Sequence, residues 1–285
     1  MSQLRAFLDT IRFEHTIFAL PFAYLGMILA AGGFPGWQTF IWITIAMAAA
    51  RTVAFAVNRY ADRVYDARNP RTRDRPIPSG RLSPRATLLY GAVALAVLVA
   101  AAWQLNPLAL RLLPGALVLL VGYSYCKRFT WLSHWILGAT DGLAPAGAWV
   151  AVRGTLDPPA GLLWLAVTWW IAGFDLIYAC QDTEFDRSEG LQAVPARFGN
   201  AVALRWARIN HLLTVVTLGA AGWALGLGWP YWLGLSAVTL LLIYEHSLVS
   251  PADLSRVNVA FFHVNSVIAV VMLVASWGAS LLPGG

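Results

Sequence analysis

Residues 86–104 read ATLLYGAVALAVLVAAAWQ, and no charged side chain interrupts the chain between Arg85 and Arg111. An apolar segment of about 20 residues is long enough to cross the hydrocarbon core of a bilayer as a helix. Comparable stretches recur along the 285 residues: hydrophobic residues make up 59% of the chain, charged residues only 12%, and the mean hydropathy is +0.62. Because a soluble domain carries about a quarter charged residues, the sequence predicts an all-α integral membrane protein.

Nine membrane-spanning helices are expected from the apolar runs, which are separated by Pro and Gly clusters or by charged loops. The expected helices are residues 16–31, 37–57, 85–103, 108–125, 133–152, 161–180, 201–225, 231–249 and 257–281. Two long polar loops, 58–84 and 181–199, lie between them. We expect residues 1–285 to form a single transmembrane domain.

The basic residues are concentrated in the loops that these helices place on one side of the membrane. Of the 20 Lys and Arg residues, only Arg51, Arg111 and Arg153 lie elsewhere, which leaves 17 on the side that carries the N-terminus. The positive-inside rule therefore predicts a cytoplasmic N-terminus and cytoplasmic polar loops. The expected location is a bacterial inner membrane. This topology accounts for the net charge of +6 without nucleic acid, and the N-terminus does not resemble a cleavable signal peptide.

The first polar loop begins with NRYADRVYDARNPRTRDRPIPSG, residues 58–80. Asn58, Asp62 and Asp66 follow one another at intervals of four residues, which on a helix stacks three oxygen-bearing side chains on one face. Hard oxygen donors of this kind suit Mg²⁺. Neighbouring arginines suit a phosphate-bearing ligand, because guanidinium groups bind the phosphate oxygens that the metal does not. The stretch predicts a metal–diphosphate site at the end of a membrane helix.

The second polar loop has a similar pattern in DLIYACQDTEFDR, residues 175–187. Asp182 and Asp186 repeat the four-residue spacing, and Asp175, two helical turns earlier, is expected to point along the same face. Each pair taken alone is equally typical of a solvated helix end with local charge pairs. Because both loops are expected on one side, the two sets together favour a shared site for two or more Mg²⁺ ions, where a diphosphate leaving group is neutralised.

Several other polar residues have two interpretations. Lys127 and Arg128, on the same expected side, are typical either of positive-inside anchoring or of a diphosphate clamp. Charges within membrane helices are costly, so Arg51, Asp141 and Glu245 are functional candidates or members of ion pairs. The cysteines Cys126 and Cys180 show no disulfide spacing and are interpreted as packing residues. Four histidines show no metal-ligand spacing and are interpreted as packing or helix-contact residues: His134, His211, His246 and His263.

Three segments together carry a family resemblance. They are the Asn58–Asp62–Asp66 row followed by RTRDRPIPSG at 71–80, YSYCKRFT at 123–130, and YACQDTEFDR at 178–187. In this order and separation they resemble the signatures of the UbiA superfamily of membrane prenyltransferases, and with nine expected helices the resemblance extends over essentially the whole chain. It implies a bundle of nine transmembrane helices around a central cavity, open laterally to lipid, beneath a cytoplasmic cap.

The resemblance also implies roles for individual residues in Mg²⁺-dependent polyprenyl transfer. The Mg²⁺ and the prenyl diphosphate head would lie under the cap, with the isoprenoid tail in the membrane. By position, the implied Mg²⁺–diphosphate set is Asn58, Asp62, Asp66, Asp182 and Asp186. The residues implied to contact the diphosphate or an anionic acceptor are Arg63, Arg71, Arg75, Lys127 and Arg128. The chain departs from the family pattern at Arg59, where Asp is frequent, although the Asn–Asp–Asp row is intact.

Two further segments indicate which branch of the UbiA superfamily the chain resembles. FEHTIFALPFAY at 13–24 and GLQAVPARFG at 190–199 resemble 4-hydroxybenzoate polyprenyltransferase-like proteins of the ubiquinone pathway. They equally resemble the relatives that prenylate aminodeoxyfutalosine on the futalosine route to menaquinone. The expected reaction transfers a polyprenyl group from its diphosphate to an aromatic acceptor such as 4-hydroxybenzoate and releases diphosphate. Asp175 is the candidate for taking the ring proton or orienting the acceptor.

Two other classes of membrane protein fit the sequence less well. A CDP-alcohol phosphotransferase would place glycines and an Ala-Arg pair among the aspartates of one helix pair, which this sequence does not do. An anionic-solute transporter favours Gly/Pro breaks at corresponding places in two halves, whereas Pro21, Pro114 and Pro145 are scattered. The expected partners are the two substrates and membrane lipid, with no nucleic acid and no obligate protein partner.

Overall fold

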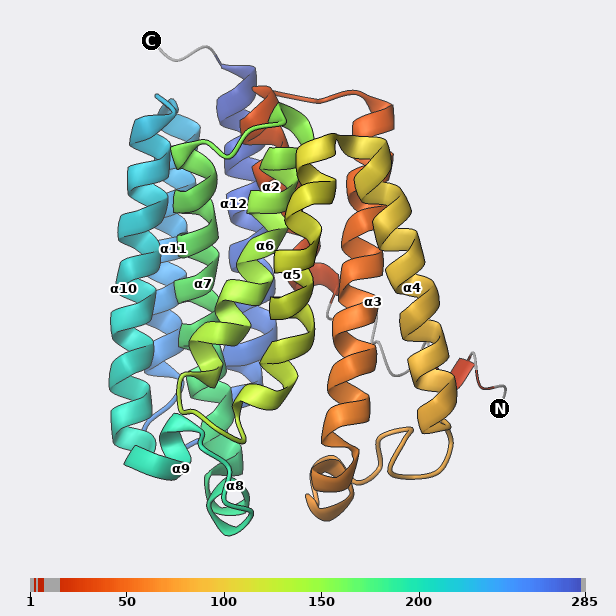
Figure 1. Cartoon of the computed structure of the whole chain (residues 1–285). Helices are drawn as coiled ribbons and strands as arrows, with labels where there is room; N and C mark the ends of the chain where they lie inside the picture. The colour runs from red at the N-terminus through yellow and green to blue at the C-terminus, as the bar shows by residue number, and fades with distance from the viewer. Residues whose placement is uncertain (1–2, 4, 8–15, 283–285) are drawn as a thin grey trace.

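The computed structural model describes residues 3, 5–7 and 16–282, and every regular element in this part of the chain is helical. Figure 1 shows the long helices side by side in one bundle. The long helices are α2 (Thr16–Ala31), α3 (Trp37–Arg68), α4 (Pro84–Leu105), α5 (Pro107–Cys126), α6 (Ser133–Arg153), α7 (Pro158–Ala179), α10 (Asn200–Ala224), α11 (Trp229–Ser247) and α12 (Asn265–Leu281). The short elements are η2 (Cys180–Asp182), α8 (Thr183–Ser188), α9 (Val194–Phe198) and the π-helical segment η3 (Val259–Val264). The first residues of the FEHTIFALPFAY segment lie outside the described residues.

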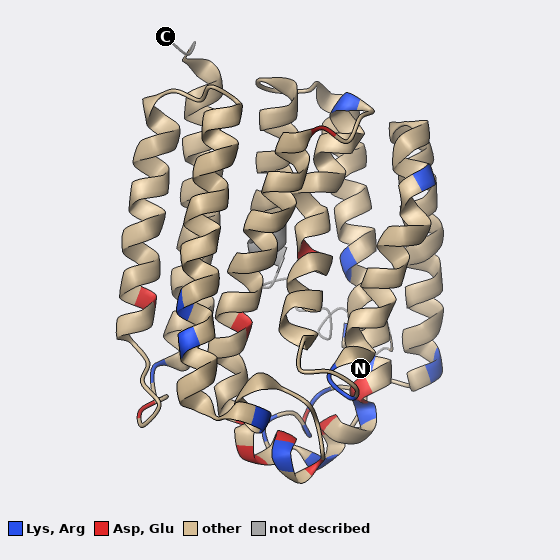
Figure 2. Ribbon diagram, turned by 60° about the vertical axis from the view of Figure 1, so that its left-hand side comes forward, with Lys and Arg blue, Asp and Glu red and all other residues tan. Residues whose placement is uncertain are grey.

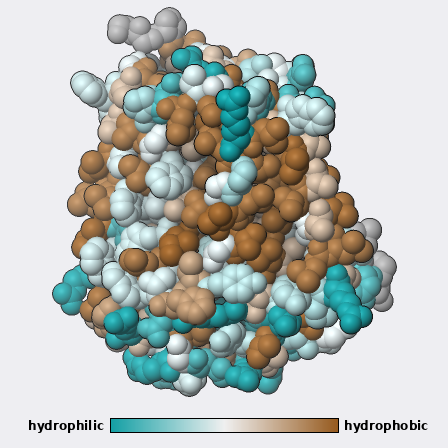
Figure 3. All heavy atoms as spheres, in the orientation of Figure 1, coloured by the Kyte–Doolittle hydropathy of each residue, from teal (hydrophilic) through white to brown (hydrophobic). Residues whose placement is uncertain are grey.

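The surface of the bundle is that of a membrane protein. Five helical stretches in the described residues are long and apolar enough to cross a membrane: 37–68, 84–105, 107–126, 158–188 and 259–281. Figure 3 shows hydrophobic side chains across the middle of the molecule, with hydrophilic ones gathered toward the ends. Large apolar side chains such as Trp103 (76% exposed) and Val118 (72% exposed) face outward, as expected next to lipid. The expected all-α class is confirmed.

Helix α3 is longer than the sequence predicted. It continues past Val57 to Arg68, so the Asn58–Asp66 row lies on a helix and not in a loop. No Gly or Pro occurs in this part of the chain until Pro70. A proline disfavours the helical conformation of the residue before it, and Asn69 is accordingly extended, with φ −82° and ψ 120°. The row therefore keeps a regular helical spacing up to the point where α3 ends.

The second carboxylate segment is divided by a change of helix type. Helix α7 ends at Ala179, η2 forms a 3₁₀ turn over Cys180–Asp182, and α8 begins at Thr183. A 3₁₀ turn has 3.0 residues per turn instead of 3.6, so side chains before and after it lose the α-helical register. Over three residues this shift is about 60°, so Asp175 and Asp182 stay on one side of the segment; Asp175 lines the large cavity and Asp182 the adjoining polar one.

The polar segments meet at one end of the bundle. Figure 1 places the residues after α3 at the same end as α8 and α9, and Figure 2 shows most acidic and basic residues gathered there. An ion pair of 2.9 Å joins Arg68 Nη1 to Glu189 Oε2. The Gln192 N–H donates to the Lys127 carbonyl at 2.7 Å, which ties the α8–α9 connection to the end of α5. The prediction that the two polar loops share one side is confirmed as a shared end of the bundle.

Close packing of α6 on α7 forms one wall of the interior. A Cβ added at Gly138 would lie 2.2 Å from the Thr168 carbonyl oxygen, so only glycine permits this approach of the two helices. The largest core cluster includes Trp170, Leu176 and Tyr231, each nearly inaccessible to solvent. This half of the bundle is densely packed, whereas a cavity of about 1350 Å³ lies on the other side of α6 and α7.

Candidate active site

A small polar cavity of about 150 Å³ lies where the two carboxylate segments meet. It receives side chains from the end of α3, the loop after it, the α5–α6 connection, and the η2–α8 segment. Its charged and amide lining residues are Asp62, Asp66, Asn69, Arg71, Arg75, Lys127, Arg128, Asp182 and Asp186. The structure thus brings together four of the five predicted metal ligands and four of the five predicted basic residues.

The first carboxylate row is held by cations from two directions. Arg128 Nη2 donates to Asp62 Oδ1 at 3.0 Å, and Asn58 Nδ2 donates to Asp62 Oδ2 at 2.9 Å. Arg75 Nη1 lies 2.7 Å from Asp66 Oδ1. Asp66 is only 6% exposed, so this ion pair lies largely inside the protein. The two carboxylates therefore face the cavity with a guanidinium group beside each.

The second set is paired in the same way. Arg71 binds Asp182 through two contacts, Nε to Oδ1 at 3.0 Å and Nη2 to Oδ2 at 2.5 Å. Burial lowers the pKa of Arg71, but the hydrogen bond to Asp182 and the charges of Asp182 and Asp66 together outweigh it, so the pKa lies above its ordinary value. Asn69 Nδ2 also donates to Asp182 Oδ1 at 3.1 Å, and Lys127 Nζ lies 2.6 Å from Asp186 Oδ2. These contacts join the loop after α3 to the η2–α8 segment.

The donor chemistry of this cavity fits a hard divalent cation bound together with phosphate. Asp66 Oδ2 and Asp186 Oδ1 are buried oxygens without a hydrogen-bond partner. Within the described residues no three His, Cys, Asp or Glu side chains lie close enough together to hold an ion by themselves. Each of the four carboxylates is instead next to a basic side chain, so a bound cation would need additional oxygens from a ligand.

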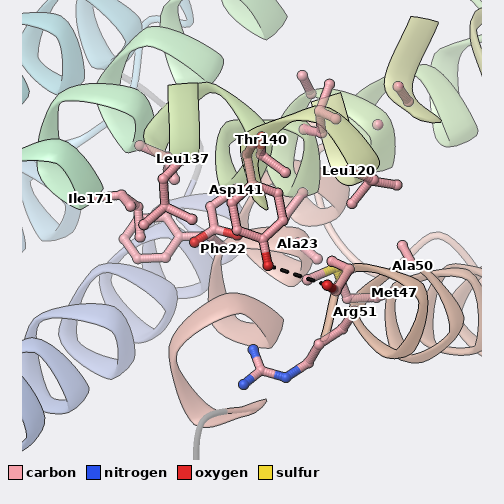
Figure 4. A pocket seen from close by; sticks show the side chains of 18 of the residues that line it. Phe22, Ala23, Met47, Ala50, Arg51, Leu120, Leu137, Thr140, Asp141 and Ile171 are labelled. Atoms are coloured by element: carbon pink, nitrogen blue, oxygen red, sulfur yellow. Dashed lines mark hydrogen bonds between the residues drawn. The ribbon is translucent and has the colours of Figure 1, made fainter. Parts of the chain in front are cut away.

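The large cavity adjoins the polar one, because Arg71 and Arg75 line both. It extends between α3, α5, α6 and α7 and is lined mainly by apolar side chains. Figure 4 shows a close view of the pocket, with Arg51 from α3 and Asp141 from α6 at its border. Arg51 Nε and Nη2 are buried and have no hydrogen-bond partner in the described residues. A long apolar chain with a polar group at one end fits the combined space.

Asp175 lies on the wall of this large cavity and contacts His134. The distance from His134 Nδ1 to Asp175 Oδ2 is 2.6 Å, and the Val194 N–H donates to His134 Nε2 at 3.2 Å. His134 is 2% exposed, while the Asp175 side chain is 25% exposed. Near the same cavity, Tyr178 OH accepts a hydrogen bond from Arg71 Nη1 at 2.9 Å.

Three further predicted candidates also lie away from the polar cavity. Arg63 donates to the Tyr60 carbonyl at 2.6 Å and packs over the Tyr60 ring, so it lines neither cavity. Asn58 lines the large cavity, one turn before Asp62. Glu245 is fully buried among α11 and α12, where Asn265 Nδ2 donates to it at 3.0 Å, and belongs to the packed core.

Comparison with known proteins shows the family. The UbiA prenyltransferase family matches residues 19–267. A 4-hydroxybenzoate octaprenyltransferase of Cupriavidus necator is 34% identical over 244 residues, which cover 84% of this chain and 84% of that protein. The chain belongs to the UbiA prenyltransferase family. It is therefore a prenyltransferase and an integral membrane protein.

Solved structures of UbiA homologues have the same fold. The apo structure of a UbiA homologue from Aeropyrum pernix K1 superimposes with a TM-score of 0.86 at 33% identity, covering 95% of this chain and 99% of that one. A UbiA homologue from Archaeoglobus fulgidus bound to GPP and Mg²⁺ gives a TM-score of 0.73 at 20% identity, covering 97% of this chain and all of that one. At 20% identity, the similarity to the Archaeoglobus fulgidus homologue shows a shared fold and no more.

Two polar residues of this UbiA prenyltransferase were not singled out from the sequence. Tyr178 lies four residues before Asp182, so its place within the second signature was an available signal. His134 carries no comparable signal, because its neighbours in the sequence are Ser and Trp and its partner Asp175 is far away in the chain. The contact with Asp175 joins two helices and agrees with the interpretation of His134 as a packing or helix-contact residue, whereas the polar partners of its two ring nitrogens were not predicted.

Proposed function

We propose that this prenyltransferase moves a polyprenyl group from polyprenyl diphosphate to an aromatic acceptor such as 4-hydroxybenzoate, releasing diphosphate, in quinone biosynthesis. The observation that carries the proposal is the junction of the two cavities at Arg71 and Arg75. On one side lie four carboxylates and four cations, and on the other about 1350 Å³ of mainly apolar space. A prenyl diphosphate likewise has a charged group at one end and a long apolar chain at the other.

The polar cavity is the proposed place for the diphosphate and Mg²⁺. The ligands of the metal would be Asp62, Asp66, Asp182 and Asp186 in this cavity, with Asn58 beside it on the wall of the large cavity. Buried oxygens of Asp66 and Asp186 that have no hydrogen-bond partner support this. The GPP- and Mg²⁺-bound Archaeoglobus fulgidus homologue supports this assignment through the shared fold. When bound, Mg²⁺ neutralises charge on the diphosphate as the allylic bond breaks.

The basic residues around the cavity would bind the diphosphate oxygens. Arg71, Arg75, Lys127 and Arg128 already lie within ion-pair distance of the four carboxylates. They supply positive charge to the leaving group, which stabilises the negative charge that develops on it as the C–O bond breaks. The allylic C–O bond breaks with its electron pair going to the diphosphate, while the apolar cavity excludes water from the resulting allylic cation.

The acceptor is proposed to lie in the large cavity beside Arg51 and Asp175. An aromatic acid would satisfy the unpartnered nitrogens of Arg51 with its carboxylate. A ring carbon then provides the electron pair for the new C–C bond. The ring proton passes to Asp175, and the electrons of that C–H bond restore aromaticity.

Aminodeoxyfutalosine is a second candidate acceptor. Asp141 lies at the border of the same pocket as Arg51 and Asp175 and offers an additional carboxylate to hydroxyl or amino groups. A nucleoside acceptor has such groups, whereas 4-hydroxybenzoate has one hydroxyl. The same reaction at the ring would then serve menaquinone formation.

The membrane arrangement completes the proposal. We infer that the nine long helices cross a bacterial inner membrane as one domain, with the polar cavity at the cytoplasmic end. Most of the Lys and Arg residues lie at that end (Figure 2), which supports this orientation.

The test is a competition experiment with purified protein in Mg²⁺. Geranyl and longer prenyl diphosphates are supplied with 4-hydroxybenzoate and aminodeoxyfutalosine together, and products are identified by mass spectrometry. We expect a prenylated aromatic product and release of diphosphate, with the Arg51→Gln variant raising the KM of the acceptor and not that of the prenyl diphosphate. Failure of both acceptors in the wild-type protein would overturn the aromatic assignment.

A further inference from the structure

His134 and Asp175 form a buried contact next to the large cavity. The contact of 2.6 Å is within the range of a charge-assisted hydrogen bond. His134 lies in the first turn of α6 and Asp175 near the end of α7, so the contact crosses between two helices. No other hydrogen bond of the Asp175 carboxylate occurs among the described residues, and its side chain is 25% exposed toward the cavity that it lines.

The contact from Val194 defines how the histidine can be protonated. The Val194 N–H, at the start of α9, donates to His134 Nε2 at 3.2 Å. A ring nitrogen that accepts a hydrogen bond carries no proton, so the neutral imidazole carries its proton on Nδ1. The Nδ1–H therefore donates to Asp175 Oδ2. The ring itself is 2% exposed and cannot reach a ligand in the cavity.

We infer that His134 is a positioning residue for Asp175: its Nδ1–H holds one carboxylate oxygen, so that the other faces the cavity ready to accept the acceptor's ring proton. The inference rests on the proposed function and adds a residue to it. A carboxylate that received no hydrogen bond from His134 would be free to rotate about its terminal bond. It would also lose a donor that favours its ionised form.

The arrangement separates the proton acceptor from the diphosphate site. Asp175 and His134 line no part of the polar cavity, which holds Asp182 and Asp186. A change at His134 that acts through Asp175 should therefore affect turnover with the acceptor and leave binding of the prenyl diphosphate unchanged. A merely structural change would disturb both, because α9 connects to the loop beside Lys127 through Gln192.

Two isosteric substitutions distinguish the roles of the two ring nitrogens. In His134→Asn, the amide nitrogen takes the place of Nδ1 and can donate to Asp175, while Val194 loses its acceptor. In His134→Gln, the longer side chain places its amide oxygen near Nε2 and can accept from Val194, while Asp175 loses its donor. His134→Phe fills the space and removes both contacts.

The experiment measures kcat and both KM values for prenyl transfer by these variants. We expect His134→Gln and His134→Phe to lower kcat by about 10- to 100-fold, the usual effect of removing a residue that orients a functional group, with the KM of the prenyl diphosphate unchanged. His134→Asn should remain within about threefold of the wild-type kcat/KM, a loss below 1 kcal/mol. The double variant His134→Gln/Asp175→Asn should be no slower than Asp175→Asn, because both changes remove one function.

A spectroscopic measurement checks the contact without turnover. In protein with ¹⁵N-labelled histidine, the His134 signal should show Nδ1 protonated and Nε2 unprotonated, and Asp175→Asn should shift it. If wild-type protein forms product and His134→Gln is as active as His134→Asn, or the signal shows the proton on Nε2, the inference is overturned. Absence of any prenylated product from the wild-type protein would instead overturn the proposed function.

Discussion

The two carboxylate segments of this prenyltransferase have similar sequences and different structures. The first, on α3, is a single uninterrupted helix that presents Asn58, Asp62 and Asp66 in one row from the large cavity into the polar one. The second continues through the 3₁₀ turn η2 into α8, and along it Asp175 lines the large cavity and Asp182 the polar one. The distance of seven residues along this segment therefore separates a candidate proton acceptor from candidate metal ligands.

The two segments also depend on each other for charge. Arg71, which follows α3, pairs with Asp182, and Arg128, which follows α5, pairs with Asp62. Only the Asp66–Arg75 pair lies within one polar segment. The four ion pairs thus connect three separate stretches of the chain, and the polar cavity exists only when all three come together.

The largest effect is expected from the first row. Asp62→Ala or Asp66→Asn should reduce prenyl transfer at saturating Mg²⁺ by at least about 100-fold, because each removes a hard oxygen ligand and leaves a guanidinium without its partner. The measurement is product formation as a function of Mg²⁺ concentration. Asp253→Asn, on an exposed loop that lines neither cavity, is the control. If Asp62→Ala transferred prenyl groups at the wild-type rate, Asp62 would not be a ligand of Mg²⁺.

A smaller and different effect is expected at Asp175. Asp175→Asn should lower kcat by about 10- to 100-fold, since an amide is a poor proton acceptor, while the Mg²⁺ dependence and the KM of the prenyl diphosphate stay at wild-type values. Steady-state kinetics on both substrates measure this. If Asp175→Asn and Asp182→Asn raise the Mg²⁺ requirement equally, the division of the second segment between two cavities does not hold in function.

Arg71→Lys tests the connection between the segments. Lysine keeps the charge but cannot form the two parallel contacts to Asp182, so we expect the KM of the prenyl diphosphate to rise by about 5- to 10-fold. Arg73→Lys, two residues away and exposed, is the matched control because it lines neither cavity. Equal KM values for both variants would argue against a role of Arg71 at the diphosphate.

The smallest effect is expected from the outer ion pair of the two segments. The Arg68 side chain is 60% exposed, so its contact with Glu189 is accessible to solvent. Glu189→Gln should change the free energy of unfolding by less than about 1 kcal/mol and leave prenyl transfer unchanged. Thermal unfolding in detergent and an activity assay measure the two quantities. A large fall in Tm would show that this surface contact, and not the buried pairs, holds the polar end together.

The sequence determined the class of the fold and most members of the site. Uncharged apolar runs exclude a soluble domain, since their side chains have to be removed from water, and charges confined to a few loops predicted where the polar end lies. The four-residue spacing of the α3 row is a local property, because hydrogen bonding within one helix maintains it. Asn58, Asp62 and Asp66 were for that reason predicted as a row, although the end of α3 was placed too early.

Only the tertiary structure decided which residues meet. The His134–Asp175 contact joins two helices, and the Arg71–Asp182 contact joins two loops more than a hundred positions apart. Arg63, predicted from its place in the signature, instead packs on its own helix over Tyr60. The 3₁₀ turn between α7 and α8 was likewise not predicted from the spacing of the aspartates. A spacing reports the geometry of one continuous element, whereas contacts between elements depend on how their apolar faces pack.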